Sequence, residues 1–395
     1  MNSKVLFCLI SVLLVTGCIS EYNTKLPSYD KQILIVDGNI TENSEVVFYL
    51  SLSFPMDSLY IPQENLNINA KLIMIGNNGY ESAPAINSGR GVYKLNVGEL
   101  DDNVEYGIRI EYDGNTYQST LSKPILTPEI DSISWVQPEN AGTIFFRVST
   151  HDNSNEAKFF SWSFTENWEI TAEFNTTLFY DRDRNIFYSI YPAPNYYCWK
   201  SFESNTFIVG STESLKENRI VNKPFYQNTP EDSRFSMLYC ITVYQKAISK
   251  NAYDYYLNKI KLNDEMGGLF TPQPSELSGN ISCITDPSKK AMGYIEISKN
   301  TSQKRIFIYP GQLTYPNTYY YCQAIANDSV NVILNENNFT YADFYMLGYR
   351  PAGSQIDVRY YPEIIPAEWA SASCTDCIMG GGTKNKPDFW PNNHE

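Results

Sequence analysis

The sequence predicts a mainly β protein of the all-β class, in which an amino-terminal immunoglobulin-like or prealbumin-like sandwich precedes a larger β-rich domain with one amphipathic helix. Short segments in which every second residue is apolar recur along most of the chain, and turn residues separate them. Aromatic residues make up 14% of the chain and include 31 tyrosines, which suits the packed faces of twisted sheets. The length of 395 residues is enough for two or three domains with real cores.

The first 17 residues have the features of a lipoprotein signal peptide. Lys4 precedes an apolar run over residues 5–15, which is too short for a transmembrane helix of roughly 20 residues. Small residues stand directly before Cys18, as a lipoprotein signal peptidase requires. We therefore expect residues 1–17 to be removed, Cys18 to be lipidated, and residues 18–30 to form a polar tether.

Lipidation at Cys18 implies a chain that is anchored to the outer membrane and lies outside the cytoplasm. Glu21, close behind the cysteine, resembles the surface-export signal of Bacteroidota lipoproteins. We therefore expect the protein to face the cell surface, with the periplasmic face as the alternative.

Residues 31–124 are predicted to form the amino-terminal sandwich. Three segments have the length and β-branched content of strands: Ile33–Val36, Val46–Phe54 and Tyr106–Tyr112. In the last of these, apolar and polar residues alternate, so that one face is apolar. Asp113-Gly114 can supply the positive φ angles of a type I′ turn, and Asn115–Thr120 returns as the second strand of a hairpin.

Pro124 and Pro128 mark a linker, and the larger domain is expected over residues 125–395. Its predicted strands are Ile133–Val136, Thr143–Thr150, Lys158–Phe174, Ala291–Ile297 and Arg305–Tyr309. In the longest strand, three aromatic residues and Glu166 fall on one face, whereas serine and threonine side chains fall on the other. Glu166 is expected at the rim of the aromatic face, held by hydrogen bonds; contact with a ligand is the alternative.

One segment, near residues 249–265, has the pattern of an amphipathic helix. Ser249 is a good N-cap, and apolar residues follow at the spacing of one helical face. Gly267-Gly268 can end the helix, and the prolines at 272 and 274 prevent its continuation. The remaining residues, 311–395, are expected to be rich in loops with short strands.

Six cysteines remain after Cys8 leaves with the signal peptide and Cys18 takes the lipid. They are Cys198, Cys240, Cys283, Cys322, Cys374 and Cys377. In an exported chain they fit up to three disulfides, with no preference among connectivities and with some thiols left unpaired as an alternative. The Cys374–Cys377 pair is less consistent with a zinc or redox site, because no second CxxC and no βαβ pattern accompany it.

The carboxyl-terminal tail contains Gly380-Gly381-Gly382 and Phe389-Trp390. The exposed backbone of the three glycines and the rings of Phe389 and Trp390 could bind a partner or a ligand. The simpler interpretation, which we favour, is that Trp390 folds back onto the second domain and that the nearby cysteines fasten this return.

Charge and chemistry point away from nucleic acids and from catalysis. The formal net charge of −14 becomes −15 when Lys4 is removed, and such a surface repels nucleic acid. A nucleophile usually needs a histidine base. His151 stands in a polar stretch that we interpret as an exposed loop, and His394 is the penultimate residue. We expect a protein that is not an enzyme and has no cofactor.

Two acidic stretches resemble the first ligand positions of a calcium-binding loop. Asp152, Ser154 and Glu156 alternate, as do Asp181 and Asp183 with the following asparagine. Both stretches lack the central glycine and the distal glutamate of an EF-hand. Solvated turns explain them, and we expect no metal site.

Several motifs occur in a characteristic order. They are Glu166-Asn167-Trp168, Tyr197-Cys198-Trp199-Lys200, Gly267-Gly268-Leu269-Phe270-Thr271-Pro272, Cys374-Thr375-Asp376-Cys377 and Lys386-Pro387-Asp388-Phe389-Trp390. Together they resemble the Bacteroidota domain-of-unknown-function family 4249 over nearly the whole mature chain. The resemblance implies a lipoprotein whose genes tend to neighbour TonB-dependent outer-membrane receptors, and it brings no catalytic residues.

Three functions remain for comparison. The first is a tethered accessory or ligand-binding partner of a TonB-dependent transporter in nutrient uptake, because tethering raises the local concentration of a binding module. The second is a free-standing surface adhesin that binds a glycan or a peptide. The third is a hydrolase that uses two carboxylates, although no pair of acidic residues stands out.

Overall fold

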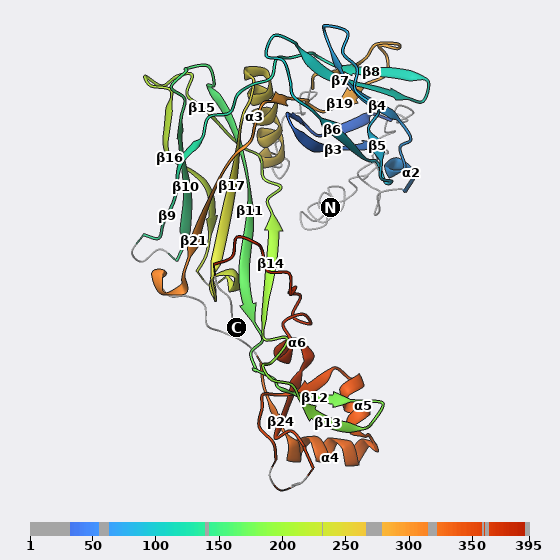
Figure 1. Ribbon diagram of the computed structural model, residues 1–395, viewed down its shortest axis with the longest axis vertical. Helices are drawn as coiled ribbons and strands as arrows, with labels where there is room; N and C mark the ends of the chain where they lie inside the picture. Colours follow the sequence, from blue (N-terminus) through green and yellow to red (C-terminus); the bar gives the residue numbers. More distant parts are fainter. Residues whose placement is uncertain are drawn as a thin grey trace, which may run out of the picture.

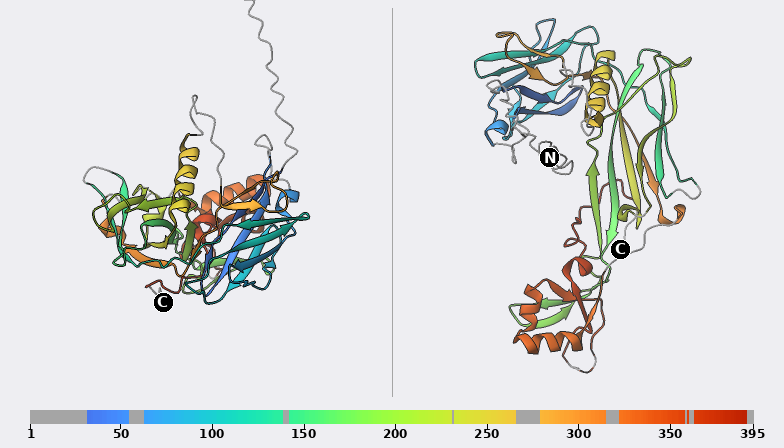
Figure 2. Two further views of the ribbon diagram at one scale, coloured as in Figure 1. Left: turned by 90° about the horizontal axis from the view of Figure 1, so that it is seen from above. Right: turned by 180° about the vertical axis from the view of Figure 1, so that it is seen from behind.

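The computed structural model describes residues 32–54, 63–138, 142–230, 232–265, 279–314, 322–357, 359 and 363–391. The expected signal peptide, Cys18, the tether, the glycines at 267 and 268, and His394 lie outside these residues. Three parts follow one another along the molecule: an amino-terminal sandwich, a central sandwich and a smaller distal lobe at the far end (Figure 1). The view from behind shows the same arrangement (Figure 2). The prediction of a mainly β protein is confirmed.

The amino-terminal sandwich consists of two main sheets around one core. One sheet has the order β19-β1-β3-β6-β5, with bounds Ala291–Met292, Leu34–Asp37, Ser44–Leu52, Val92–Val97 and Ile86–Asn87. The other has the order β18-β8-β7-β4, with bounds Ile281–Cys283, Asn115–Ser119, Tyr106–Tyr112 and Lys71–Gly76. The short strands β2 (Ile40–Thr41) and β20 (Ile297–Ser298) pair with each other, and α2 spans Gln63–Leu66. Phe48, Leu72 and Ile108 are fully buried between the sheets.

The predicted hairpin is present as β7 and β8. Asp113 and Gly114 have φ angles of 49° and 70°, as a type I′ turn requires. Tyr106, Ile108 and Ile110 are buried on the apolar face of β7. The alternation of apolar and polar residues in this segment therefore predicts its buried face correctly.

A late segment of the chain, residues 281–298, completes the amino-terminal sandwich. Ile281 pairs with Ser119, and Leu34 pairs in parallel with Ala291. This differs from the expected linear division at residue 124, which places the segment in the second domain. Gly293 allows the close approach, since a Cβ there would lie 2.1 Å from the Val36 carbonyl oxygen.

The central sandwich packs one three-stranded sheet against a larger one. The first has the order β16-β10-β9, with bounds Arg219–Asn228, Ile144–His151 and Ile130–Val136. The second has the order β14-β11-β17-β21, with bounds Tyr197–Glu203, Phe159–Thr171, Tyr239–Ala247 and Ser302–Ile308, and β15 (Ile208–Ser211) also pairs with β11. Short 3-10 turns lie at η1 (Ser233–Phe235) and η2 (Pro310–Gln312). The core between the sheets contains Phe146, Phe160 and Trp162.

The predicted helix is α3 (Lys250–Glu265), which lies between the two sandwiches (Figures 1 and 2). The Ser249 hydroxyl accepts a hydrogen bond from the Ala252 amide at 3.1 Å, which confirms the N-cap. Ala252 is buried beside Phe159 and Tyr253. Among the described residues, no helix combines the length and apolar character that crossing a bilayer requires.

The distal lobe consists of the β12–β13 hairpin and most of residues 322–379. Its elements are β12 (Leu178–Asp181), β13 (Ile186–Ser189), β22 (Ile325–Ala326), α4 (Asn327–Asn337), α5 (Tyr341–Met346), β23 (Tyr349–Pro351), β24 (Glu368–Ser371) and α6 (Ala372–Thr375). The expected short strands are present after residue 311 as β22, β23 and β24, but α4, α5 and α6 show that α3 is not the only helix of the chain. The signal in α4 is weak because only a few apolar residues, such as Val330 and Leu334, face the core among residues of poor helix propensity.

Glu296 links the amino-terminal sandwich to the start of α3 and should make stability depend on pH. It is 3% exposed, and its carboxylate accepts hydrogen bonds from the Ser249 hydroxyl at 2.6 Å and the Ser249 amide at 3.1 Å. Burial raises the pKa of Glu296, and the contacts with Ser249 offset this only in part. The protonated side chain therefore favours the folded state, and this stability is lost as pH rises through the folded pKa.

We expect Glu296→Gln to be more stable than the parent protein at neutral pH by about 1 kcal/mol, because a buried charge is removed. The difference should shrink as pH falls toward the pKa of a free glutamate. Thermal unfolding of both proteins across a pH series measures this. Glu111→Gln, which removes an exposed carboxylate in β7, serves as the control. A difference between Glu296→Gln and the parent that does not change with pH contradicts the prediction.

Candidate functional site

Glu166 lies at the centre of a buried polar network in the central sandwich. Its carboxylate accepts hydrogen bonds from the Tyr239 hydroxyl at 2.6 Å and from the Arg234 guanidinium at 2.5 Å. The guanidinium also lies 5.1 Å from the ring centroids of Trp168 and Phe202. Burial raises the pKa of Glu166, and the contacts with Tyr239 and Arg234 offset only part of this effect.

The expected rim position of Glu166 is therefore wrong, although the expected hydrogen bonds are present. The side chain is 0% exposed. Arg234 reaches it from η1, and a cation at this distance is what allows a carboxylate to remain on an aromatic face. The network stabilises the sandwich and leaves Glu166 out of reach of a ligand.

His151 is not an exposed loop residue, as its polar neighbours suggested. It ends β10, and its Nδ1 lies 2.6 Å from a carboxylate oxygen of Asp131 in β9. The pairing of β9 with β10 brings the two residues together, and neither sequence neighbourhood indicates it. His151 thus has a structural partner in the neighbouring strand.

The two acidic stretches are turns. The Asp152 carboxylate accepts hydrogen bonds from the backbone amides of Ser154, Glu156 and Ala157. Burial raises the pKa of Asp152, but these hydrogen bonds outweigh that effect and leave the pKa below its usual value. Asp181 holds the β12–β13 turn in a similar way. In the part of the chain that the structure describes, no group of three or more histidine, cysteine or acidic residues could hold a metal ion.

Four of the six candidate cysteines form disulfides. Cys198 pairs with Cys377 and Cys322 with Cys374, so the two cysteines of the CxxC segment have different partners. Cys240 and Cys283 are buried free thiols, which is the alternative of unpaired cysteines that the sequence left open. They belong to the central and the amino-terminal sandwich, too far apart in the fold to pair. Burial raises the pKa of Cys240 to about 12, so its thiol stays protonated at neutral pH.

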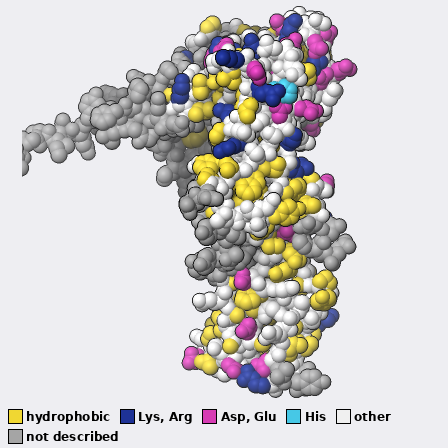
Figure 3. Space-filling view, turned by 90° about the vertical axis from the view of Figure 1, so that its left-hand side faces the viewer, with side chains coloured by type: hydrophobic (Ala, Val, Ile, Leu, Met, Phe, Trp, Pro, Cys, Tyr) yellow, Lys and Arg dark blue, Asp and Glu magenta, His cyan; other side chains and the backbone are white. Residues whose placement is uncertain are grey.

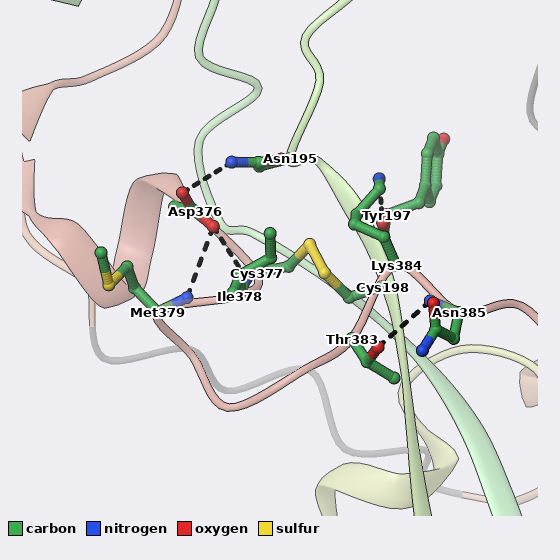
Figure 4. The surroundings of a disulfide bond; sticks show 10 residues. All are labelled: Asn195, Tyr197, Cys198, Asp376, Cys377, Ile378, Met379, Thr383, Lys384 and Asn385. Carbon is green, nitrogen blue, oxygen red and sulfur yellow. Dashed lines mark hydrogen bonds between the residues drawn. A yellow bond between two sulfur atoms is a disulfide. The ribbon is translucent and has the colours of Figure 1, made fainter.

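The tail returns along β14 and is fastened there (Figure 4). The Cys198–Cys377 disulfide joins residues 179 positions apart. Farther on, Thr383 and Trp199 exchange two backbone hydrogen bonds of 2.9 Å, as antiparallel strands do. The disulfide and the bridge together hold the tail against the central sheet.

Close packing explains the glycine and tryptophan of the tail. A Cβ on Gly382 would lie 2.6 Å from the Cβ of Cys198 and 2.9 Å from the Cys377 carbonyl oxygen. Trp390 is 4% exposed and packs in one cluster with Trp199. The interpretation that Trp390 folds back onto the second domain is confirmed. Because its ring is buried, Trp390 is not available to insert into a groove on a partner.

An exposed apolar face lies instead on the β12–β13 hairpin of the distal lobe. The hairpin's inner residues pack on the lobe core: the ring centroid of Phe187 lies 5.7 Å from that of Trp369. On the other face, Phe179 pairs with Tyr188 at a centroid distance of 6.0 Å, and Ile186 is 46% exposed. We call Phe179, Ile186 and Tyr188 the hairpin outer face.

The distal lobe exposes further apolar side chains, and Asp181 stands across the hairpin from Ile186. Ile190, Tyr191, Met346 and Leu347 are exposed in the same lobe. Figure 3 shows apolar side chains over the middle of one side of the molecule and over the distal lobe, whereas most charged side chains of that side lie at its upper end. Exposed apolar surface of this kind is typical of protein interaction sites.

The edges of the hairpin add a second means of contact. In the described residues, β12 and β13 form a sheet of only two strands, without pairing to a third. The β12 side lies beside β23, so the edge of β13 is the one whose backbone groups can pair with another chain. The sequence does not reveal this site, because a short strand with alternating aromatic residues has the same pattern whether its second face is covered or exposed. The pattern Ile186, Tyr188, Ile190 was the available signal.

Comparison with known families identifies the chain over most of its length. The family model described as Domain of unknown function (DUF4249) matches residues 19–304. The match includes the amino-terminal sandwich and most of the central sandwich, and it ends before the tail on which the resemblance also drew. Comparison with curated proteins gave no match. Because the matched segment spans more than half of the 395 residues, the chain belongs to the DUF4249 family.

Proposed function

We propose that the protein is an exported lipoprotein, anchored through Cys18 to the outer membrane, that acts without catalysis as an accessory or ligand-binding partner of a TonB-dependent transporter in nutrient uptake. The hairpin outer face is the observation that carries this proposal. It presents apolar surface at the end of the molecule farthest from the amino-terminal sandwich (Figure 1). A partner that covers this face would remove apolar side chains from water.

The construction of the distal lobe supports a role in docking. Two disulfides hold it: Cys322–Cys374 lies within the lobe, and Cys198–Cys377 joins it to β14. A surface that is already held in place loses little conformational entropy when it binds. Tethering to the same membrane raises the effective concentration of the lobe at the transporter to roughly millimolar.

The test is co-purification from detergent-solubilised outer membranes with the full-length lipoprotein as bait. We expect a β-barrel receptor to co-purify with the parent protein, and its yield to fall at least tenfold with Ile186→Asp, because a charge would be buried in an apolar interface. Val221→Asp is the matched control. Val221 lies in β16 of the central sandwich and is 63% exposed, so the same substitution there should leave the yield unchanged.

Two results would contradict the proposal. If no receptor co-purifies with the parent protein, the alternative of a free-standing surface adhesin for a glycan or peptide replaces it. If Ile186→Asp and Val221→Asp lower the yield equally while both variants remain folded, the hairpin outer face is not the docking site.

A further inference from the structure

A cavity of about 470 Å³ lies where the amino-terminal sandwich, the central sheet and α3 meet. This volume is within the range of small-molecule sites. Its walls come from three sources: Asp37 at the end of β1 with Asn39 after it, the outer face of β11 and β17, and Tyr256 of α3. The connection from β14 to β15, residues 204–207, closes the remaining side. The cavity therefore depends on how the parts of the molecule are placed together.

The Lys246 side chain of β17 lines both this cavity and the adjoining one. Its ammonium donates one hydrogen bond, to the hydroxyl of Thr41, a lining residue of the adjoining cavity, at 3.2 Å, and among the described residues it forms no ion pair. Burial lowers the pKa of Lys246, and no neighbouring carboxylate opposes this. Lys299 in the adjoining cavity differs, since it pairs with Asp102 at 2.6 Å and with Glu42 at 3.5 Å. Lys246 is half-buried, and a partly desolvated ammonium without a counter-ion favours an anion beside it.

Residues with hydroxyl groups line the sheet side of the cavity. Ser161 stands directly across the ladder from Lys246, and Ser163 stands across from Tyr244. All four side chains line the cavity, on the face of β11 opposite its aromatic core. Ser204 and Thr206 add further hydroxyl groups from the β14–β15 connection. The lining is thus rich in groups that donate to and accept from hydroxyls.

Two stacked aromatic rings form a further wall of the cavity. The rings of Phe207 and Tyr256 stack with centroids 5.5 Å apart, and Lys259 Nζ lies 4.0 Å from the Phe207 ring centroid. Asp37, the carboxylate that lines the cavity, is exposed to solvent. The lining of the cavity therefore carries one lysine, Lys246, and one carboxylate, Asp37, while Lys259 contacts the Phe207 ring without lining the cavity.

We propose that this cavity binds a small carboxylated sugar, with the Lys246 ammonium holding the carboxylate and the serine and threonine side chains holding the ring hydroxyls. Phe207 and Tyr256 offer an apolar surface to the sugar ring. The carboxylate satisfies the ammonium, and the hydroxyls suit a polar lining that an apolar acid would leave unpaired. This inference is independent of the transporter partner, because it concerns a ligand of the isolated protein.

Calorimetric titration of the full mature chain with galacturonate, galactose and acetate tests the proposal. Galacturonate and galactose differ only in the carboxylate that replaces a hydroxymethyl group. We expect saturable binding of galacturonate, at least tenfold weaker binding of galactose, and no saturation by acetate at the same concentrations. Lys246→Met should weaken galacturonate binding by about 30-fold, the effect of one charge-assisted hydrogen bond.

The melting temperature separates a binding role of Lys246 from a structural one. Lys246→Met should leave it unchanged or raise it, because an unpaired, half-buried charge is replaced by an apolar side chain of similar length. Lys71→Met, on an exposed lysine of the other sandwich, is the control and should bind galacturonate as the parent does. The proposal fails if galacturonate does not bind, if galactose or acetate binds equally well, or if Lys246→Met binds like the parent.

Discussion

Replacing both Cys198 and Cys377 with alanine is expected to release the tail from β14 and to destabilise the protein by about 3–5 kcal/mol. The disulfide closes a loop of 179 residues, and the entropy that a crosslink removes from the unfolded chain grows with loop length. Its loss also frees the segment that positions Trp390 in its buried cluster. Chemical denaturation measures the change in stability, and limited proteolysis followed by mass spectrometry detects the released tail.

Two variants serve as comparisons for this disulfide. Alanine at both Cys322 and Cys374 opens a loop of only 52 residues inside the distal lobe, and its effect should be smaller by about 1 kcal/mol. Cys283→Ala removes a buried free thiol from the amino-terminal sandwich and should leave the tail resistant to protease. If the tail of the Cys198–Cys377 double variant is as resistant as that of the parent, the strand-like bridge and Trp390 suffice to hold it.

Glu166→Ala is expected to destabilise the central sandwich by about 3 kcal/mol, because it leaves the Tyr239 hydroxyl without its acceptor and the partly buried guanidinium with Asp232 as its remaining carboxylate. The carboxylate is fully buried, so water cannot take its place without opening the core. The double variant Glu166→Leu with Arg234→Met removes both charges and should recover most of the loss. A double-mutant cycle by denaturant unfolding measures the coupling.

An exposed ion pair in the same molecule provides a reference for the change in stability caused by Glu166→Ala. Glu45 and Lys94 are 3.1 Å apart on paired strands of the amino-terminal sandwich, and both side chains are close to half exposed. Glu45→Ala should therefore cost less than about 1 kcal/mol. Equal effects of Glu166→Ala and Glu45→Ala would show that the buried network contributes no more than a surface contact.

Local patterns predicted the elements whose signal lies within a few neighbouring residues. The hairpin at Asp113-Gly114 follows from turn chemistry, and α3 follows from Ser249 and one apolar stripe. The buried face of β11 follows from its period of two. The expected return of Trp390 to the second domain also held, because a large apolar ring near exported cysteines is best accommodated in a core.

Local sequence patterns could not predict which residues far apart in the chain pair with each other. No feature near Glu166 indicates that Arg234 will reach it, and none near Cys374 indicates Cys322 as its partner. The outer face of β13 and the cavity at Lys246 could not be predicted from the sequence for the same reason. Exposure and the lack of a counter-ion are properties of the folded molecule.

The sequence by itself determined the class of the protein: mainly β, acidic, with its clearest helix in place and with a family membership that the comparison confirms. Only the tertiary structure decided that residues 281–298 complete the first sandwich, which cysteines pair, and which apolar and charged side chains remain without a partner. The reason is physical. Periodicity and turn chemistry act between near neighbours in the chain, whereas burial, ion pairing and crosslinks are set by segments that meet only when the whole chain is folded.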